Sequence, residues 1–403
     1  MFAQQLLLPA LAVFGIAAAA DSTGCAQPTA TIVAQADVSA IASCTTFAGS
    51  ILLPSSAAGV ISLDGPQQIG GDFIVDNATA LTSLSSSSIA SISGIFHLDS
   101  LTVLSTLSFT ELTEVGSIEW SALPVLQQLT FPSFIKKAKD VLITNTFLSS
   151  LEGINLDTVE TLNINNNGRL TSFSTQVANI TGLLNIEANG KSLKVEFPNL
   201  ETAANMTFRN CSSISIPSLK TVNGSLGFYG NYIESLAAPN LTTLGSTTEA
   251  NTGSFALVAN GLLNNISFPQ LSSIAGAFQI ANNTQLYNIS FPDVSQVGGA
   301  IDFAGNFSTP VLTGLKVVSG GFNMQSLSVI DCAGFDKLNG NVIQGVYDCV
   351  SATDDAKSGL GGSSTSSGSS AKPTSSKAAA VSYGISEAVA GLSVMGGLLQ
   401  MIL

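Results

Sequence analysis

The acidic side chains of two successive sequence repeats are the first place where paired groups in this chain could do chemistry. Asp76 and Asp99 occupy equivalent positions, with His97 and Glu119 beside them. Glycoside hydrolysis needs two carboxylates a few ångströms apart, as an acid and a base or nucleophile. One hypothesis is therefore a carbohydrate-active enzyme that uses Asp76, Asp99 and Glu119. No further catalytic spacing accompanies these residues, so we predict that the protein is not an enzyme and has no catalytic residue.

A second group of side chains is suited to binding. Amide, carboxylate, guanidinium and phenol groups occupy matching positions in the middle repeats, at Asn163, Asn185, Glu187, Arg209 and Tyr229. Such groups can hydrogen-bond sugar hydroxyls, and the ring can stack on a sugar. We predict a candidate ligand face for a polysaccharide or a protein partner here. The alternative is a surface that is only solvated.

Composition narrows the remaining classes of chemistry. The 403 residues include 26 Asp and Glu but only 13 Lys and Arg, which gives a net charge of −13. This balance argues against nucleic acid as a partner, because phosphate contacts need basic patches. One His and the absence of a Cys-x-x-Cys motif leave zinc unsupported, and we predict no metal and no cofactor. Mean hydropathy is +0.42, yet no central stretch approaches the roughly 20 apolar residues that span a bilayer.

The elements that must position these side chains belong to a sequence repeat. Most copies have a small residue followed by alternating apolar residues, such as Phe73 and Val75, which predict a short strand with one buried face. The leading glycine allows a tight bend into the strand. Twelve copies, 20 to 29 residues apart, begin at Gly71, Gly94, Gly116, Lys139, Glu160, Gly182, Ala204, Gly224, Gly253, Gly276, Gly299 and Gly320.

One such unit cannot bury its own apolar face, so neighbouring copies must stack. We therefore predict an all-β-dominated solenoid of about 12 coils, a right-handed parallel β-helix or a leucine-rich-repeat-like fold with disulfide-capped ends. Trp120 occupies an inward position and is expected in the core. Between the strands a motif of apolar residue, Pro, any residue and apolar residue recurs, as in Phe197–Leu200. We place its proline at the start of a second short strand.

Asparagine ends many of the copies, where it suits a left-handed turn and can hydrogen-bond the backbone of a neighbouring coil. We expect a ladder of such residues at Asn77, Asn145, Asn166, Asn210, Asn282 and Asn306. Ten sequons predict N-glycans at Asn77, Asn179, Asn205, Asn210, Asn223, Asn240, Asn265, Asn282, Asn288 and Asn306. Because a ladder would shield Asn282 and Asn306, we expect higher occupancy at Asn179, Asn240, Asn265 and Asn288.

Both ends of the chain carry processing signals. Residues 1–20 read as a signal peptide cleaved after Ala20. A Ser/Gly/Thr tract (358–378) precedes the terminal segment 379–403, which becomes apolar from Ala388. This order is the signal for a glycosylphosphatidylinositol (GPI) anchor, and sixteen apolar residues are short for the rival transmembrane helix. We predict attachment at Gly368, with Ser367 and Ser369 as alternatives, and removal of 379–403.

The five cysteines agree with secretion. Two close pairs predict Cys25–Cys44 and Cys332–Cys349 disulfides, each closing a loop of about 20 residues, and Cys211 is left as a small buried hydrophobe. The predicted domain order is an N-terminal cap (21–70), the repeats (71–326), a C-terminal cap (327–357) and the linker.

Taken together, these features carry a resemblance to a known family. The chain from about residue 25 to 350, with both terminal signals, resembles the fungal GPI-anchored cell-wall organisation proteins, whose fold is like the receptor L domain. The segments that carry it are Ser39–Phe47, Glu114–Trp120, Ala203–Asn210, Ser225–Asn231, Ile301–Asn306 and Gly320–Gln325. The unpaired Cys211 departs from a purely cap-paired pattern.

The resemblance implies a role in wall integrity and morphogenesis, at the outer face of the plasma membrane and in the cell wall, without catalysis. The partners it implies are the GPI lipid, N-glycans and a wall polysaccharide such as glucan. A binding module that uses the open face of the strands is the alternative function, and a wall-modifying enzyme is the third.

Overall fold

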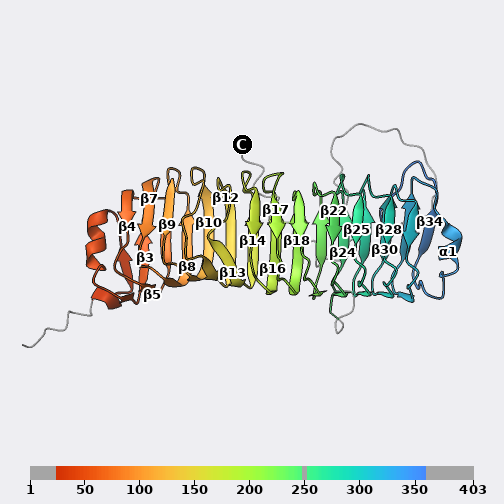
Figure 1. Cartoon of the computed structure of the whole chain (residues 1–403), viewed down its shortest axis with the longest axis horizontal. Helices are drawn as coiled ribbons and strands as arrows, with labels where there is room; N and C mark the ends of the chain where they lie inside the picture. The colour runs from red at the N-terminus through yellow and green to blue at the C-terminus, as the bar shows by residue number, and fades with distance from the viewer. Residues whose placement is uncertain (1–23, 247–251, 360–403) are drawn as a thin grey trace, which may run out of the picture.

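The computed structural model describes residues 24–246 and 252–359, which form one elongated stack of parallel strands (Figure 1). The predicted β-solenoid is therefore confirmed. Equivalent residues of successive copies are paired, so that Phe73 lies beside Phe96 and Asp76 beside Asp99. The signal cleavage site and the three candidate anchor residues lie outside the described ranges and stay predictions.

The strands of the twelve predicted copies form one wall of the solenoid. They are β6 (Phe73–Asp76), β8 (Ser91–Asp99), β10 (Glu114–Leu123), β12 (Asp140–Thr146), β14 (Thr161–Asn165), β16 (Asn179–Glu187), β18 (Thr202–Arg209), β21 (Leu226–Tyr229), β24 (Phe255–Val258), β27 (Phe278–Ala281), β30 (Ile301–Gly305) and β33 (Phe322–Ser326). We call the outward side chains at the fourth and sixth positions of these copies, from Ile74 and Asp76 to Asn323 and Gln325, the open β-face.

The stack is longer than the expected 12 coils. Strands β1 (Thr29–Thr31) and β3 (Ser50–Leu53) precede β6, and β34 (Tyr347–Val350) follows β33, all in parallel pairing. The buried residues Ile51 and Leu53 show the same apolar alternation as the later copies. Gly49–Ser55 fits the repeat pattern, with Pro54 at its sixth position and the small residue Ser55 at its end, so this strand is a copy that the count of twelve left out.

Shorter strands complete each coil. One set continues the main sheet: β2 (Thr46–Phe47), β5 (Gln68–Ile69), β11 (Ile135–Lys137), β13 (Ile154–Thr158), β20 (Thr221–Val222), β23 (Thr243–Leu244), β26 (Ser273–Ile274), β29 (Gln296–Val297) and β32 (Val317–Val318). The second wall contains β4 (Ala58–Ser62), β7 (Ala80–Ser86), β9 (Thr106–Phe109), β15 (Ser172–Ser174), β17 (Lys194–Glu196), β19 (Ser213–Ser215), β22 (Ser235–Ala237), β25 (Asn265–Ser267), β28 (Asn288–Ser290) and β31 (Thr309–Val311).

The recurring proline lies after the second-wall strand and not at its start. Pro198 follows β17 within a turn in which the Leu200 N–H donates to the Phe197 carbonyl. A turn after the strand suits proline because proline has no N–H to donate to a strand ladder. Our placement of the motif was therefore wrong by a few residues, while the buried Phe197 and Leu200 are inward as expected.

A single apolar core runs through the stack, and aromatic rings contact one another from coil to coil. Phe96 lies 5.1 Å from Phe73 and 5.5 Å from Trp120, measured between ring centroids. Trp120 is fully buried, which confirms its predicted place in the core. Its indole N–H has no hydrogen-bond partner among the described residues.

Glycine begins many copies because the backbones of successive bends lie against each other. A Cβ added at Gly299 would lie 2.7 Å from the Gly276 carbonyl carbon, and one at Gly320 would lie 2.6 Å from the Gly299 carbonyl carbon. Only a residue without a side chain fits this spacing. Close stacking of the coils, more than the bend itself, therefore explains these glycines.

Asparagines form a buried ladder, one residue after the predicted positions. Asn77, Asn145, Asn166, Asn210 and Asn282 do adopt the expected left-handed conformation, with φ between 52° and 61°. Asn306 does not, and the exposed Asn282 is not part of the ladder. The left-handed residue turns the chain so that the next side chain points inward. The ladder therefore consists of Asn167, Asn189, Asn231, Asn260 and Asn283.

Cys211 occupies a ladder position between Asn189 and Asn231. Its N–H donates to the Asn231 Oδ1 at 3.0 Å, as an asparagine in that place would. Its thiol is fully buried, which agrees with the expected small hydrophobe. In the ladder, each backbone N–H donates to the amide oxygen of the asparagine in the next coil. Cys211 has a thiol in place of this amide, so its side chain offers no amide oxygen to the Asn189 N–H.

Burial also makes the Cys211 thiol unreactive, which gives a first testable prediction. It raises the thiol pKa to about 12 from 9.0. We expect iodoacetamide at pH 8 to label Cys211 only after unfolding, because the thiolate is the reactive form. Between pH about 9 and 12 the unfolded thiol ionises first, so stability falls by up to about 1.4 kcal/mol per pH unit. Cys211→Ala should lack this part of the pH dependence, and rapid labelling of the native protein would contradict the prediction.

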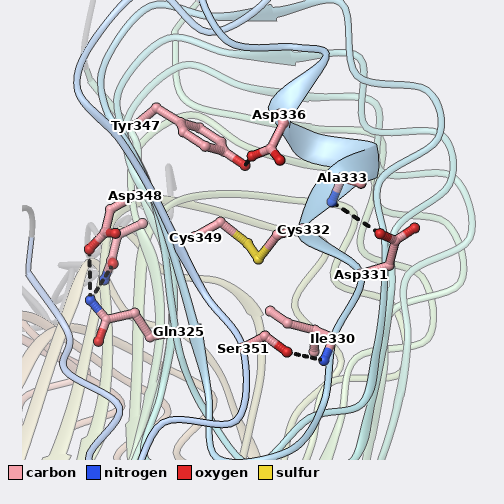
Figure 2. The surroundings of a disulfide bond; sticks show 11 residues. Gln325, Ile330, Asp331, Cys332, Ala333, Asp336, Tyr347, Asp348, Cys349 and Ser351 are labelled. Atoms are coloured by element: carbon pink, nitrogen blue, oxygen red, sulfur yellow. Dashed lines mark hydrogen bonds between the residues drawn. A yellow bond between two sulfur atoms is a disulfide. The ribbon is translucent and has the colours of Figure 1, made fainter.

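Both predicted disulfides are present near the ends of the stack. The Cys25–Cys44 disulfide links the 3-10 helix η1 (Gly24–Ala26) to the segment that follows the 3-10 helix η2 (Gln35–Ala40). Cys332 and Cys349 join α1 (Cys332–Asp336) to β34, as Figure 2 shows. A hydrogen bond also links these two elements, because Tyr347 Oη of β34 donates to the Asp336 carboxylate of α1. Burial and this carboxylate raise the pKa of Tyr347. The last strand is therefore covered by a helix.

Candidate ligand face

The acidic cluster lies at the N-terminal part of the open β-face, as the sequence predicts. Asp76 is exposed beside Asp99 in the next coil. His97 Nδ1 lies 3.4 Å from Glu119 Oε2. The Asp99 carboxylate accepts hydrogen bonds from the hydroxyls of Ser100 and Ser121, which occupy both of its oxygens.

These contacts give Asp99 and Glu119 hydrogen-bond partners within the sheet, whereas Asp76 is exposed. Among residues 24–246 and 252–359, no group of three or more His, Cys, Asp or Glu side chains is placed to hold a metal ion.

The predicted ligand residues of the middle coils do come together. Asn163 Oδ1 accepts from Asn185 Nδ2 at 3.0 Å, and Asn185 Nδ2 also lies 3.1 Å from Glu187 Oε1. Glu187 is paired with Arg209 at 3.5 Å, and the Arg209 guanidinium lies 4.4 Å from the Tyr229 ring centroid. One connected row of polar groups therefore runs along the solenoid axis across four neighbouring strands, β14, β16, β18 and β21.

An apolar strip follows this polar row. Ala256, Val258 and Ala281 form a small buried cluster, and Tyr229 packs against it. A Cβ added at Gly227 would lie 2.3 Å from the Tyr229 ring, so the glycine allows the ring to lie flat on the sheet. Burial raises the Tyr229 pKa, and the Arg209 charge opposes this shift. The ring is therefore a neutral, flat platform between the amides and the apolar strip.

A second polar row lies beyond the apolar strip, and the sequence analysis did not identify it as a site. Gln279, Asp302 and Asn323 occupy the fourth positions of β27, β30 and β33 and lie in register. Gln325 adjoins them at a sixth position. The sequence does contain a signal for this second row, because amide and carboxylate residues recur at the fourth positions of β27, β30 and β33 as they do in the middle coils. Unlike the middle row, it has no aromatic residue beside it.

The ten sequons avoid the open β-face. Asn77, Asn210 and Asn282 lie at the left-handed turns, and Asn265 and Asn288 lie on the second wall. Asn205, at the second position of its copy, lies at the edge of the face, where its Oδ1 accepts from the Ser225 N–H. The remaining sequons are in bends, strand starts or turns, at Asn179, Asn223, Asn240 and Asn306. The asparagines at the fourth and sixth positions are not in sequons.

The exposed side chain of Asn282 removes the reason given for low glycan occupancy at this sequon. Asn306 is half-buried, and its Oδ1 accepts from the Ser328 hydroxyl at 2.8 Å, so some shielding remains there. Asn240 donates from Nδ2 to the Pro217 carbonyl at 2.8 Å, whereas the Asn265 side chain has no such contact with another residue of 24–246 or 252–359. Which sequons carry glycans stays a prediction.

Within the described part of the chain, no helix is long and apolar enough to cross a membrane. Some surface charges pair between coils, as in the Lys220–Glu201 contact at 2.8 Å and the longer Lys137–Glu114 contact at 3.5 Å. Exposed pairs of this kind contribute little stability, because water and salt screen both charges.

Comparison with known proteins points to one group of fungal proteins. The chain is 41% identical over 367 residues to "Protein ecm33" of Aspergillus fumigatus, which covers 90% of each chain. It is 38% identical over 358 residues to a "Cell surface GPI-anchored protein" of Arthroderma benhamiae, with 88% of this chain and 89% of the relative covered. A shorter match, 36% over 231 residues, links 57% of this chain with 50% of "Cell wall mannoprotein PST1" of Saccharomyces cerevisiae. No family model and no solved structure matches the chain.

Proposed function

This chain belongs to the family of fungal GPI-anchored cell-wall proteins that includes Aspergillus fumigatus protein ecm33, and we propose that it supports wall organisation without catalysis. Its place is the fungal cell surface and wall. The observation that carries the proposal is the rigid, disulfide-capped solenoid with its continuous core. Such a stack is suited to act as a glycosylated structural element.

A complementation experiment separates this function from catalysis. In cells that lack the protein, we expect a variant with Asp76→Asn, Asp99→Asn and Glu119→Gln to restore resistance to wall-binding dyes as well as the wild type does. The reason is that Asp99 and Glu119 have serine and histidine partners, Asp76 is exposed to solvent, and the proposal gives none of the three a role in a reaction. Growth on the dye and surface protein level are measured together.

The outcome that contradicts the structural role is specific. If the triple variant reaches the cell surface in normal amount but leaves the wall sensitive, the acidic cluster acts in chemistry and the enzyme hypothesis returns. A variant with Asp354→Asn serves as the matched control, because this exposed carboxylate lies away from the cluster.

A second function is favoured by one observation, the absence of sequons from the fourth and sixth positions of the open β-face. N-glycans on the other surfaces would leave this face accessible. Its amides, arginine and flat tyrosine offer the hydrogen bonds and the stacking surface that a polysaccharide chain needs. We propose that the open β-face binds a wall polysaccharide along the solenoid axis. Pulldown of the protein with insoluble glucan and chitin tests this, and loss of binding in an Asn163→Ala, Asn185→Ala variant is the expected result.

A further inference from the structure

The chain does not leave the solenoid at its last strand. After β34 it turns back over the open β-face, and residues 355–359, which we call the strap, lie across β33 and β30 and reach β27. The Lys357 N–H donates to Gln325 Oε1 at 2.9 Å, and the Lys357 carbonyl accepts from Asn323 Nδ2 at 2.9 Å. The Gly359 N–H donates to both carboxylate oxygens of Asp302 at 3.1 Å.

The strap rests on a built polar site. The Asp302 carboxylate accepts from Asn323 Nδ2 at 2.8 Å and from Gln279 Nε2 at 3.0 Å. Parallel, in-register pairing of the three strands places these side chains in one row. Asn323 is 1% exposed and Gln279 is 7% exposed, values unusual for outward positions. Figure 2 shows that the row continues from Gln325 to Asp348, where Gln325 Nε2 donates at 3.0 Å.

The group that this site holds is a hydroxyl. Ser358 Oγ donates to Asp302 Oδ2 at 2.6 Å and accepts from Gln279 Nε2 at 3.0 Å. A hydroxyl that donates to a carboxylate and accepts from an amide is in the environment that protein side chains provide for sugar hydroxyls. In addition, Gln279 Oε1 is buried and has no hydrogen-bond partner among the described residues. The site therefore has an acceptor that the strap leaves unused.

The strap is held by hydrogen bonds and buries little of itself. The side chains of Lys357 and Asp355 are 71% and 78% exposed. Hydrogen bonds at a surface exchange with water at small net cost, so a segment held in this way opens more readily than the core. Another molecule with the same hydroxyl chemistry can compete for the site.

We propose that Gln279, Asp302, Asn323 and Gln325 form a second binding site for wall-polysaccharide hydroxyls, which the strap occupies in the absence of ligand. Ser358 then stands in for a sugar hydroxyl, and displacement of the strap gives a polysaccharide access to the C-terminal third of the open β-face. This inference rests on the proposed polysaccharide binding by the same face.

Proteolysis reports whether the strap is docked. Trypsin cleaves after Lys357, and a protease needs an extended, released segment. We expect Asp302→Asn and Ser358→Ala, made in the full chain, each to speed cleavage at Lys357 about tenfold, because each removes a charge-assisted hydrogen bond. Asp354→Asn, which changes the exposed residue just before the strap, should cleave at the wild-type rate. Unchanged cleavage in both variants would overturn the docking that the proposal needs.

Binding to a soluble β-glucan oligosaccharide and to a chitin oligosaccharide then separates the two variants. Both free the strap, but only Ser358→Ala keeps the site intact. We expect Ser358→Ala to bind one of these probes about tenfold more tightly than the wild type, and Asp302→Asn to show no gain. Equal binding by the two strap-released variants would overturn the inference.

An Asn163→Ala, Asn185→Ala variant shows which proposal has failed. If this variant loses binding while Ser358→Ala gains none, the open β-face binds polysaccharide and only the strap site is wrong. If Ser358→Ala gains binding and the middle-coil variant keeps it, the strap site stands and the middle row is not the binding surface. If neither the wild type nor any variant binds either probe, both proposals are wrong.

Discussion

Replacing Asn260 with alanine is expected to destabilise the folded solenoid by about 4 kcal/mol. Asn260 is fully buried, and its Oδ1 accepts from both the backbone N–H and the Nδ2 of Asn231 at 3.0 Å. Its Nδ2 donates to the Phe228 carbonyl at 3.1 Å. Alanine leaves the buried Asn231 N–H without this acceptor, at a cost of about 1–3 kcal/mol, and removes the bonds to the Phe228 carbonyl and to Asn231 Nδ2, which are worth about 1 kcal/mol each. Chemical denaturation followed by circular dichroism measures the loss.

Asn145→Ala is the matched control for this prediction. Asn145 has the same residue type and lies at a left-handed turn with φ 52°, but its side chain is exposed and outside the ladder. Only the backbone preference of asparagine is lost, which costs about 1 kcal/mol. Similar destabilisation in both variants would show that the turn, and not the buried ladder, explains why asparagine recurs here.

The asparagine ladder illustrates which features of the fold can be predicted from the sequence and which cannot. The period and the alternation of apolar residues predict the strands, their inward side chains and the stacking, because each follows from burial of one face. The exact ladder position does not follow. In the Asn165, Asn166, Asn167 run, the left-handed backbone at Asn166 turns Asn167 inward, and composition does not distinguish these three residues.

The open β-face shows a similar limit at the site. Outward positions are predictable from the strand period, and Asn163, Asn185 and Tyr229 do form one surface. The burial of Asn323 is not predictable, because it depends on contacts with residues near the C-terminus of the described region. That segment has no periodic pattern, so the sequence places it only at the junction of the predicted C-terminal cap (327–357) and the Ser/Gly/Thr tract (358–378).

A glycan placed on the middle of the open β-face is expected to weaken polysaccharide binding at least about tenfold. Asn165→Thr creates a sequon at Asn163, at the centre of the proposed binding row. The outward, half-buried side chain of Asn163 would carry a glycan over the neighbouring amides, which blocks access to them. Glycopeptide mass spectrometry confirms the modification, and insoluble glucan and chitin pulldowns measure the loss.

Two controls decide whether the glycan or the substitution causes the effect. Asn165→Ala removes the same amide without creating a sequon, so it should keep most of the binding, and enzymatic removal of the glycan from Asn165→Thr should restore it. Asn265→Gln removes a predicted glycan from the second wall and should leave binding unchanged. If the glycan at Asn163 is present and binding is unaffected, the polysaccharide does not bind the middle of the open β-face. The absence of sequons there would then need another explanation, such as contact between this face and a protein.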